Sequence, residues 1–264
     1  MKTQHLLALG VLCGWAGLLP AATPLFTFET EADLTAWKWN PKNNSHLERS
    51  TSFATEGATS LKFTSPAWKK GQPEWPSFEV RPPVTNWTAY DRLVVDITNP
   101  SAERHFFSVF ISDSRVPFRE GLAHPFSLPA RGFQRFEIPI TKFPKGVNRG
   151  DVAIIHFFTQ RPGSDLALYL DNLVLLRKGE SLPPPGAAFA RQLGELARQA
   201  VADAGKVIQQ CREAAAALAD TEVLRASVQA HMGRFEAQLA RVRTDLAAAD
   251  LTLDRLTALQ AELG

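Results

Sequence analysis

The stretch from Asp165 to Leu176, DLALYLDNLVLL, constrains the fold of this chain more than any other part of the sequence. Apolar residues alternate along it, which predicts a long β-strand with one continuous apolar face. That face is predicted to hold Leu166, Leu168, Leu170, Val174 and Leu176, with Tyr169 and Asp171 pointing the other way. Strand and turn signals fill the sequence before this stretch, whereas three prolines and then a proline-free segment follow it. We therefore expect a β-domain that ends at this strand, followed by helices.

Other strand candidates precede this one at short intervals, and glycine, proline and asparagine turns separate them. They cover residues 25–29, 46–50, 60–64, 77–81, 92–98, 104–112, 125–128, 134–138 and 152–160. About ten short strands with no long helix between them are typical of a two-sheet β-sandwich. Its core is expected to contain Leu93, Val95, Ile97, Phe107, Val109, Ile111, Ile154 and Phe158, together with Trp37 and Trp87.

The sequence changes character after the sandwich. Residues 179–186 contain three consecutive prolines and have the composition of a linker, and two helices are predicted over residues 187–264. The first helix has an apolar face over residues 189–218, on which Cys211 is expected to be a small buried hydrophobe. The pair Asp220-Thr221 is a helix cap, so the chain is expected to break and restart there.

The second helix carries a coiled-coil signal. Apolar residues from Val228 to Leu263 alternate at spacings of four and three over five heptads. Neither helix is wide enough to hide its apolar side alone. Two arrangements remain open: the helices fold back as an antiparallel hairpin, or they pair with another chain. Burial of Met232, Phe235, Leu239 and Leu246 within one chain would distinguish the first from the second.

Residues 1–22 have the pattern of a signal peptide. A short basic start precedes an apolar run from Leu6 to Leu19, and Pro20-Ala21-Ala22 then supplies small residues, so cleavage is predicted near Ala22. A membrane anchor is the alternative, but the run is about 14 residues where a span needs about 20. The protein is therefore predicted to be secreted or periplasmic, with no membrane contact after cleavage.

Charge and cysteine content narrow the remaining possibilities. The net charge of +2 is too small to indicate a nucleic-acid partner. Cys13 lies in the signal segment, where Leu12 replaces the small residue typical of a lipoprotein signal, so a lipid anchor is a minor alternative. Cleavage would leave Cys211 alone, without an internal disulfide, so the domain is expected to be stabilised by its core.

Several short motifs point to one family. They are Phe26-Thr27-Phe28-Glu29 with Trp37, EGATSLK over residues 56–62, WPSF over 75–78, NWTAYDRL over 86–93 and LYLDNL over 168–173. Together they resemble carbohydrate-binding modules of the galactose-binding, jelly-roll type, which accompany bacterial glycoside hydrolases. The resemblance covers residues 24–178 and implies an all-β jelly-roll sandwich that binds a polysaccharide or oligosaccharide. The helical segment, an α-helical hairpin or coiled coil, is not part of it.

The resemblance also implies a metal. Many such modules hold a structural calcium ion between acidic residues of the first and last strands, which here match Glu29 and Asp171. Calcium prefers several hard oxygen ligands, and backbone carbonyls around Gly57 could complete the set. The alternative is that Asp171 caps a turn or accepts backbone hydrogen bonds.

Sugar binding needs flat apolar rings against the C–H face of a pyranose, with planar polar groups for its hydroxyls. The candidate rings are Trp68 and Trp75, in a polar loop, and Trp39. The candidate polar residues are Arg81, Asp96, Asp113 and Arg115, with Glu79 and Thr98 expected beside them on a sheet face. The alternatives are that the rings belong to the core and that the polar residues form a solvated face with weak exposed ion pairs.

Nothing in the sequence indicates catalysis. The six histidines are scattered without metal-binding spacing, and no phosphate-binding loop or nucleophile elbow occurs. We therefore expect an exported, non-catalytic carbohydrate-binding module on a helical stalk, which could be the N-terminal part of a polysaccharide-degrading protein. The alternative is a structural or assembly protein whose helical tail mediates oligomerisation, with the sandwich as a non-binding head.

Overall fold

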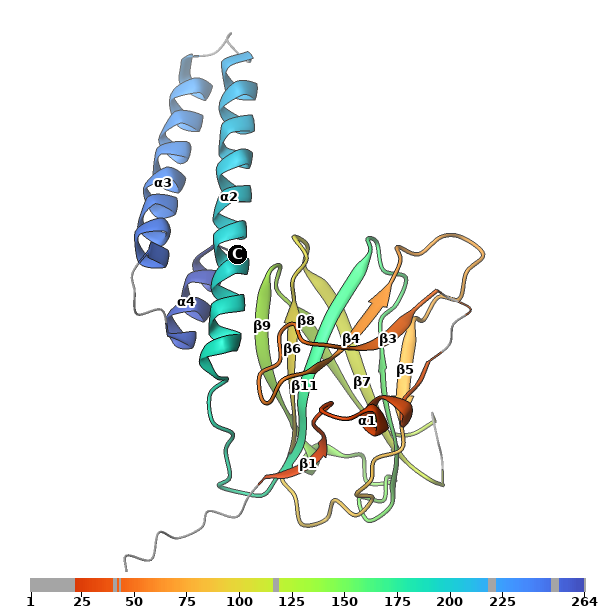
Figure 1. Cartoon of the computed structure of the whole chain (residues 1–264). Coiled ribbons are helices and arrows are strands. Elements are labelled where there is room, and N and C mark those ends of the chain that lie inside the picture. The colour runs from red at the N-terminus through yellow and green to blue at the C-terminus, as the bar shows by residue number, and fades with distance from the viewer. Residues whose placement is uncertain are drawn as a thin grey trace, which may run out of the picture.

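The computed structural model describes residues 22–39, 42, 44–115, 119–217, 222–247 and 252–263. Two antiparallel sheets form a sandwich, and the helices stand beside it (Figure 1). The six-stranded sheet contains β1 (Thr23–Phe26), β3 (His46–Ser50), β4 (Ser60–Ser65), β6 (Arg92–Asn99), β9 (Gly132–Pro139) and β11 (Leu166–Leu176). The five-stranded sheet contains β2 (Lys38–Trp39), β5 (Ser77–Val80), β7 (His105–Asp113), β8 (Leu122–Leu128) and β10 (Val152–Phe158).

The predicted sandwich is confirmed, and every strand candidate of the sequence corresponds to an observed strand. The first sheet has the order β3-β4-β11-β6-β9 with β1 also paired to β11, and the second has the order β2-β5-β10-β7-β8. Three short elements were not predicted: β2, the helix α1 (Glu31–Thr35) and a 3-10 helix, η2 (Ile140–Lys142). A capping box starts α1: the Thr30 hydroxyl accepts from the Asp33 amide, and the Asp33 carboxylate accepts from the Thr30 amide.

Aromatic rings fill the space between the sheets. Phe107 and Phe157 stack with ring centroids 5.8 Å apart and planes 8° from parallel, and Phe78 stacks on both. Trp37 and Trp87 are buried, as predicted. Such rings bury the largest apolar area per residue, so this core compensates for the lack of any disulfide among the described residues.

The predicted single apolar face of the closing strand β11 is wrong beyond Asp171. The pairing of β11 with β6 shifts between Asp171 and Val174, and Asn172 has a positive φ of 50°. This β-bulge inserts one residue and reverses the alternation. Leu173 consequently joins the main core, whereas Val174 faces the other side of the sheet.

The predicted phase of β10 is also wrong. Ile154 and Phe158 were expected in the core, but Ile155 and Phe157 are the buried residues. The ladder between β10 and β7 shifts between Val152 and Ile154, which reverses the facing of the residues that follow. Phe158 therefore lies on the outer face of the five-stranded sheet.

Three helices follow the sandwich instead of two. They are α2 (Ala187–Ala217), α3 (Glu222–Ala247) and α4 (Leu253–Leu263), so the predicted second helix is divided. The predicted capping pair Asp220-Thr221 and residues 1–21 lie outside the described residues. No helix in the described ranges is both long and apolar enough to cross a bilayer.

The long helices α2 and α3 pack against each other as a hairpin (Figure 1). Met232, Leu239 and Leu246 are buried within the chain, as the hairpin arrangement predicts. Phe235 is not, since it is 60% exposed. Cys211 is exposed, so the prediction that it is a buried hydrophobe is wrong.

The first half of α2 lies against the outer face of the six-stranded sheet, beside β9 (Figure 1). Phe189 of α2 packs edge-on against Phe133 of β9, with centroids 4.7 Å apart. Arg131, at the start of β9, forms an ion pair with Asp203 of α2. The helical segment therefore covers part of the sandwich.

Candidate functional site

The outer face of the six-stranded sheet is covered over β6 and β11. Residues 177–186, which include the predicted linker 179–186, run over it, and Leu182 packs on Val94, Val174 and Leu176. Further along, loop residue Phe53 lies over Tyr169 with ring centroids 4.8 Å apart. Helix α2 covers the β9 edge, whereas β3 and β4 keep accessible polar side chains, among them the ion pair of Glu48 with Lys62.

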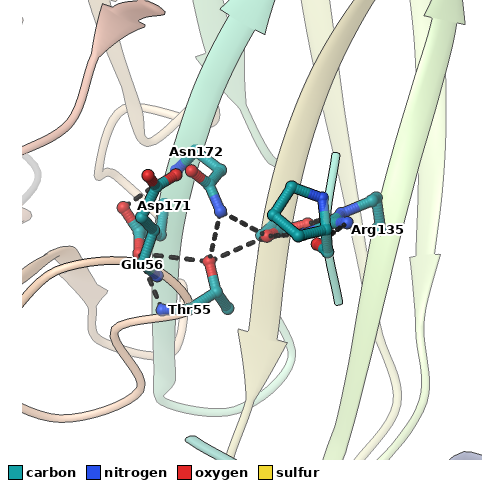
Figure 2. A network of polar contacts seen from close by, with 7 residues as sticks. Thr55, Glu56, Arg135, Asp171 and Asn172 are labelled. Carbon is teal, nitrogen blue, oxygen red and sulfur yellow. Dashed lines mark hydrogen bonds and ion pairs between the residues drawn. The ribbon is translucent and has the colours of Figure 1, made fainter. Parts of the chain in front are cut away.

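Asp96 lies in this covered face, in a network of polar contacts shown in Figure 2. Arg135 donates to its carboxylate at 2.7 and 2.8 Å, and the Thr55 hydroxyl donates at 2.7 Å. Asn172 donates to it at 3.0 Å. Asp96 is 1% exposed and lies in a different sheet from Glu79, so the prediction that both line one sugar-binding patch is wrong. Thr98, on the same strand, is equally buried.

Asp171 lies at the centre of the same network (Figure 2). Its carboxylate accepts from the amides of Thr55, Glu56 and Asn172 and from the Thr55 hydroxyl. Burial raises the pKa of Asp171 to about 7, although these hydrogen bonds act to lower it. The positive φ of Asn172 directs the Asp171 and Asn172 side chains toward the 55–56 loop, so the bulge and the network belong together.

The two carboxylates of the predicted calcium site accept hydrogen bonds from backbone amides. Glu29 accepts from the amides of Ala58 and Thr59, both at 2.9 Å, and Asp171 holds the amides at 55 and 56. Amide donors thus occupy Oε1 of Glu29 and both oxygens of Asp171, and no group of three His, Cys, Asp or Glu side chains suited to a metal occurs within the described residues. Both carboxylates fit the capping role better than calcium ligation, and calcium stays a prediction.

The outer face of the five-stranded sheet has a different character. Its strand registers place side chains in rows across β5, β10, β7 and β8. One row contains Ser77, Phe158, Ser108 and Pro125, and the next contains Glu79, His156, Phe110 and Ala123. These residues are exposed or half-buried, whereas their neighbours in the strands form the core.

Five aromatic side chains gather on this face: Trp75, Phe106, Phe110, His156 and Phe158, called here the aromatic platform. Trp75 lies just before β5 and packs edge-on against Phe158 at 5.6 Å, and the His156 ring stacks on Phe158 at 5.3 Å. Trp75 is 48% exposed and Phe106 is 70% exposed. The platform spans β5, β10 and β7, about 10 Å at the usual strand spacing.

Polar side chains border the aromatic platform at β2 and β5. Lys38 of β2 pairs with Glu79 of β5, and Arg81 follows β5 and is exposed. A small groove of about 240 Å³ is lined by Lys38, Trp39, Ser77, Phe78 and Glu79. Trp39 is half-buried against the core and edge-on to His46, so only part of its ring faces this groove.

Trp68 supports the loop that carries Trp75. The Arg161 guanidinium lies 5.0 Å over its ring, and its indole nitrogen donates to the Gln72 carbonyl at 3.2 Å. Arg161 also forms an ion pair with Glu74, next to Trp75. One face of Trp68 is therefore taken by a cation within the chain, and the same cation holds Glu74 beside Trp75.

Asp113 and Arg115 form a clip at the far end of β7. Asp113 is fully buried and accepts from the Arg115 guanidinium at 2.6 Å and from the Asn148 amide at 2.6 Å. Arg115 donates in turn to the Gly146 carbonyl at 2.7 Å. The buried Asp113 carboxylate holds two loops and does not face the aromatic platform, whereas Arg115 is exposed at the rim.

Sequence reasoning missed four members of the aromatic platform. Phe106 and Phe110 alternate with the core residues of β7, so the sequence pattern already predicted that they point away from the core. In β10, His156 could have corrected the prediction. It lies on the same side of the strand as Phe158, and a histidine favours the solvent-facing side over the core. Trp75 alone was predicted.

No protein-family model and no curated protein sequence matches this chain. Its fold is similar to the family 11 carbohydrate-binding module from Clostridium thermocellum, solved in complex with a β-1,3-1,4-mixed-linked tetrasaccharide. The identity is 13% and the TM-score 0.48, over 61% of this chain and 98% of that module. A family 30 carbohydrate-binding module has 15% identity and a TM-score of 0.38, over 53% of this chain and 78% of its own.

An exo-β-agarase is also similar, with 15% identity and a TM-score of 0.45, over 64% of this chain but 26% of the agarase. These structures include the class of module that the sequence motifs resemble. Identities and TM-scores this low transfer no ligand, so the function is inferred from the surface of this chain itself.

Proposed function

We propose that this chain is a non-catalytic carbohydrate-binding protein that holds a polysaccharide or oligosaccharide on the aromatic platform. The observation that carries the proposal is the exposure of Trp75 and Phe106 on the one outer sheet face that the helices leave uncovered. Large exposed rings cost solubility, and their concentration on one face is typical of a recognition surface. Flat rings suit the C–H face of a pyranose.

The polar groups at the rim fit the same ligand. Lys38, Glu79 and Arg81 offer charged donors and an acceptor for sugar hydroxyls beside the rings. Burial lowers the pKa of His156 to about 4, so the imidazole is neutral at physiological pH and adds no charge to the platform. The rings of the aromatic platform are neutral, and charges of both signs lie only at its border. Such a surface favours an uncharged glycan over a polyanion.

The cellular setting belongs to the same proposal. Export rests on the apolar run from Leu6 to Leu19 with its basic start and small-residue end. A place next to a catalytic domain in a polysaccharide-degrading protein rests on the family resemblance of residues 24–178. Packing of α2 on the sandwich favours a helical segment fixed to the module over a free stalk.

Affinity electrophoresis through gels that contain soluble polysaccharides tests the proposal. The wild type is expected to be retarded by at least one neutral polysaccharide, and Trp75→Ala with Phe106→Ala is expected to lose the retardation. His46→Ala, which removes an exposed ring from β3 in the other sheet, is the matched control and is expected to behave as wild type. Absence of retardation on every polysaccharide, or equal retardation of the double variant, would contradict the proposal.

The alternative function, assembly through the helical segment, is favoured by one specific observation. Phe235 and Val207 are 60% and 57% exposed on the helical hairpin, although the sequence pattern assigns Phe235 to the coiled-coil positions and Val207 to the apolar face of the first helix. The two functions are compatible, because the aromatic platform and these residues lie on separate parts of the molecule.

A further inference from the structure

A small groove lies at the edge of the five-stranded sheet, beside the aromatic platform. It has a volume of about 240 Å³ and is lined by Lys38, Trp39, Ser77, Phe78 and Glu79. Across β5 and β10, Ser77 pairs with Phe158 of the platform and Glu79 pairs with His156. A ligand that lies on the rings therefore has this groove on its flank.

Two opposite charges flank the groove without contacting each other. Lys38 of β2 lies opposite Glu79 of β5 in the strand register, a position where opposite charges ordinarily pair. Neither side chain forms an ion pair or a hydrogen bond with another described residue. The same residue types in the other sheet do pair, since Lys62 of β4 contacts Glu48 of β3 at 2.7 Å. The ammonium and the carboxylate at the groove thus keep their hydrogen-bonding capacity for a ligand.

The chemistry of the groove matches a neutral sugar unit. A hydroxyl group donates to a carboxylate and accepts from an ammonium, so neighbouring hydroxyls can contact both charges at once. Part of the Trp39 ring faces the groove and offers apolar surface to C–H groups. One charge of each sign gives no net field that would select a charged sugar. Pockets for larger ligands measure about 300–1,000 Å³, so this groove suits a single unit.

The aromatic platform is longer along the strands than across them. Phe106 and Phe110 lie four residues apart in β7, which corresponds to about 13 Å along the strand. The groove lies between β5 and β2, and β2 is the last strand of the sheet on this side. A main chain that follows the rings along the strands therefore passes the groove on one side and does not enter it.

We propose that the groove holds one neutral sugar unit that branches from the main chain, so that the protein selects branched over unbranched polysaccharides. This inference rests on the proposed function, because it takes the aromatic platform as the surface that binds the main chain. Lys38 and Glu79 then determine which polysaccharide is preferred, whereas the rings determine whether any is bound.

Titration calorimetry with matched pairs of oligosaccharides tests this inference. Each pair has one backbone with and without a single side unit: galactosyl-mannopentaose and mannopentaose, arabinosyl-xylotetraose and xylotetraose, and xylosyl-cellotetraose and cellotetraose. Wild type is expected to bind the branched member of a pair about tenfold more tightly, as one hydrogen bond to a charged group gives. Lys38→Ala with Glu79→Ala is expected to bind both members as weakly as wild type binds the unbranched one.

The matched control is Glu48→Ala with Lys62→Ala, which removes the same two charges from neighbouring strands of the other sheet and should keep the tenfold preference. Trp75→Ala with Phe106→Ala should lose binding of both members. Equal affinity of wild type for the two members of a bound pair would overturn the inference and leave the proposed function standing. A preference that survives in Lys38→Ala with Glu79→Ala would overturn it as well. Binding of no member of any pair would contradict both.

Discussion

The two outer faces of the sandwich differ in how far their outward-pointing residues are exposed, although the strands of both sheets alternate in the same way. On the six-stranded sheet, the outward residues of β6 and β11 are covered by the 53–56 loop, residues 177–186 and α2, and a buried ionic network lies beneath. On the five-stranded sheet, the outward residues form the aromatic platform and stay accessible. An outward polar residue is therefore structural on the first face, and an outward aromatic residue is free to bind on the second.

This difference teaches that outward facing in a strand is not the same as exposure. Asp96 and Phe106 both point away from the sandwich core, yet Asp96 is 1% exposed and Phe106 is 70% exposed. The distinction depends on which face the C-terminal helices cover. The variants below test each face in turn, from the largest expected effect to the smallest.

Phe189→Ala should have the largest effect, on the covered face. Phe189 is 1% exposed and packs on Phe133, so its truncation leaves a cavity between α2 and the sandwich. A loss of about 3–5 kcal/mol in the free energy of unfolding is expected, measured by urea denaturation. A loss below about 1 kcal/mol would mean that α2 does not dock on the sheet, and the two faces would then be equally open.

Arg135→Ala tests the network beneath the loop. It removes the cation that donates two hydrogen bonds to buried Asp96 and leaves that charge uncompensated, which costs about 3 kcal/mol. Arg198→Ala is the control, because its ion pair with Glu195 is exposed and contributes at most about 1 kcal/mol. Equal, small losses in the two variants would indicate that the network is solvated.

The pH dependence of stability tests Asp171. Its folded pKa of about 7 exceeds the ordinary value of 3.8, so its contribution is complete below about pH 4 and is lost as pH rises through 7. Compared with Asp171→Asn, which cannot titrate, wild type should lose roughly 4 kcal/mol of stability between about pH 4 and about pH 8. A constant difference between the two proteins over this range would show that Asp171 stays ionised.

Phe106→Ala should have the smallest effect on stability. Its ring is exposed, so the free energy of unfolding is expected to change by no more than about 0.5 kcal/mol. Phe107→Ala, one residue further along β7, removes a core ring and should cost about 3–5 kcal/mol. A large loss in Phe106→Ala would place that ring in packing, and the aromatic platform would lose its most exposed member.

The strands and the sandwich could be predicted because turn residues and alternation act locally. Two phase errors arose where the chain departs from that alternation, at the bulge beside Asn172 and at the register shift after Val152. In β10, apolar residues occupy both phases, and the wrong one was assigned to the core. A β-bulge adds a single residue, so a pattern with apolar residues on both sides does not reveal it.

The candidate site could be predicted only in part. Trp75 was found because an aromatic ring in a polar loop is conspicuous in sequence, but its packing on Phe158 joins segments 83 residues apart. Burial of Asp96 depends on Thr55 and Asn172, which reach it only in the folded sandwich. A local sequence pattern predicts on which side of the sheet a side chain lies. Whether that side chain is buried depends on segments far away in the sequence.

Protection of Trp75 by a polysaccharide tests the central claim most directly. Trp75 is about half exposed, whereas Trp37 and Trp87 are buried, so acrylamide quenching of tryptophan fluorescence reports largely on Trp75, with a lesser share from Trp39 and Trp68. Addition of a polysaccharide that retards the protein is expected to reduce quenching in wild type and to leave Trp75→Phe unchanged. Unchanged quenching of wild type by a retained polysaccharide would place the sugar elsewhere and contradict the claim that the open sheet face binds it.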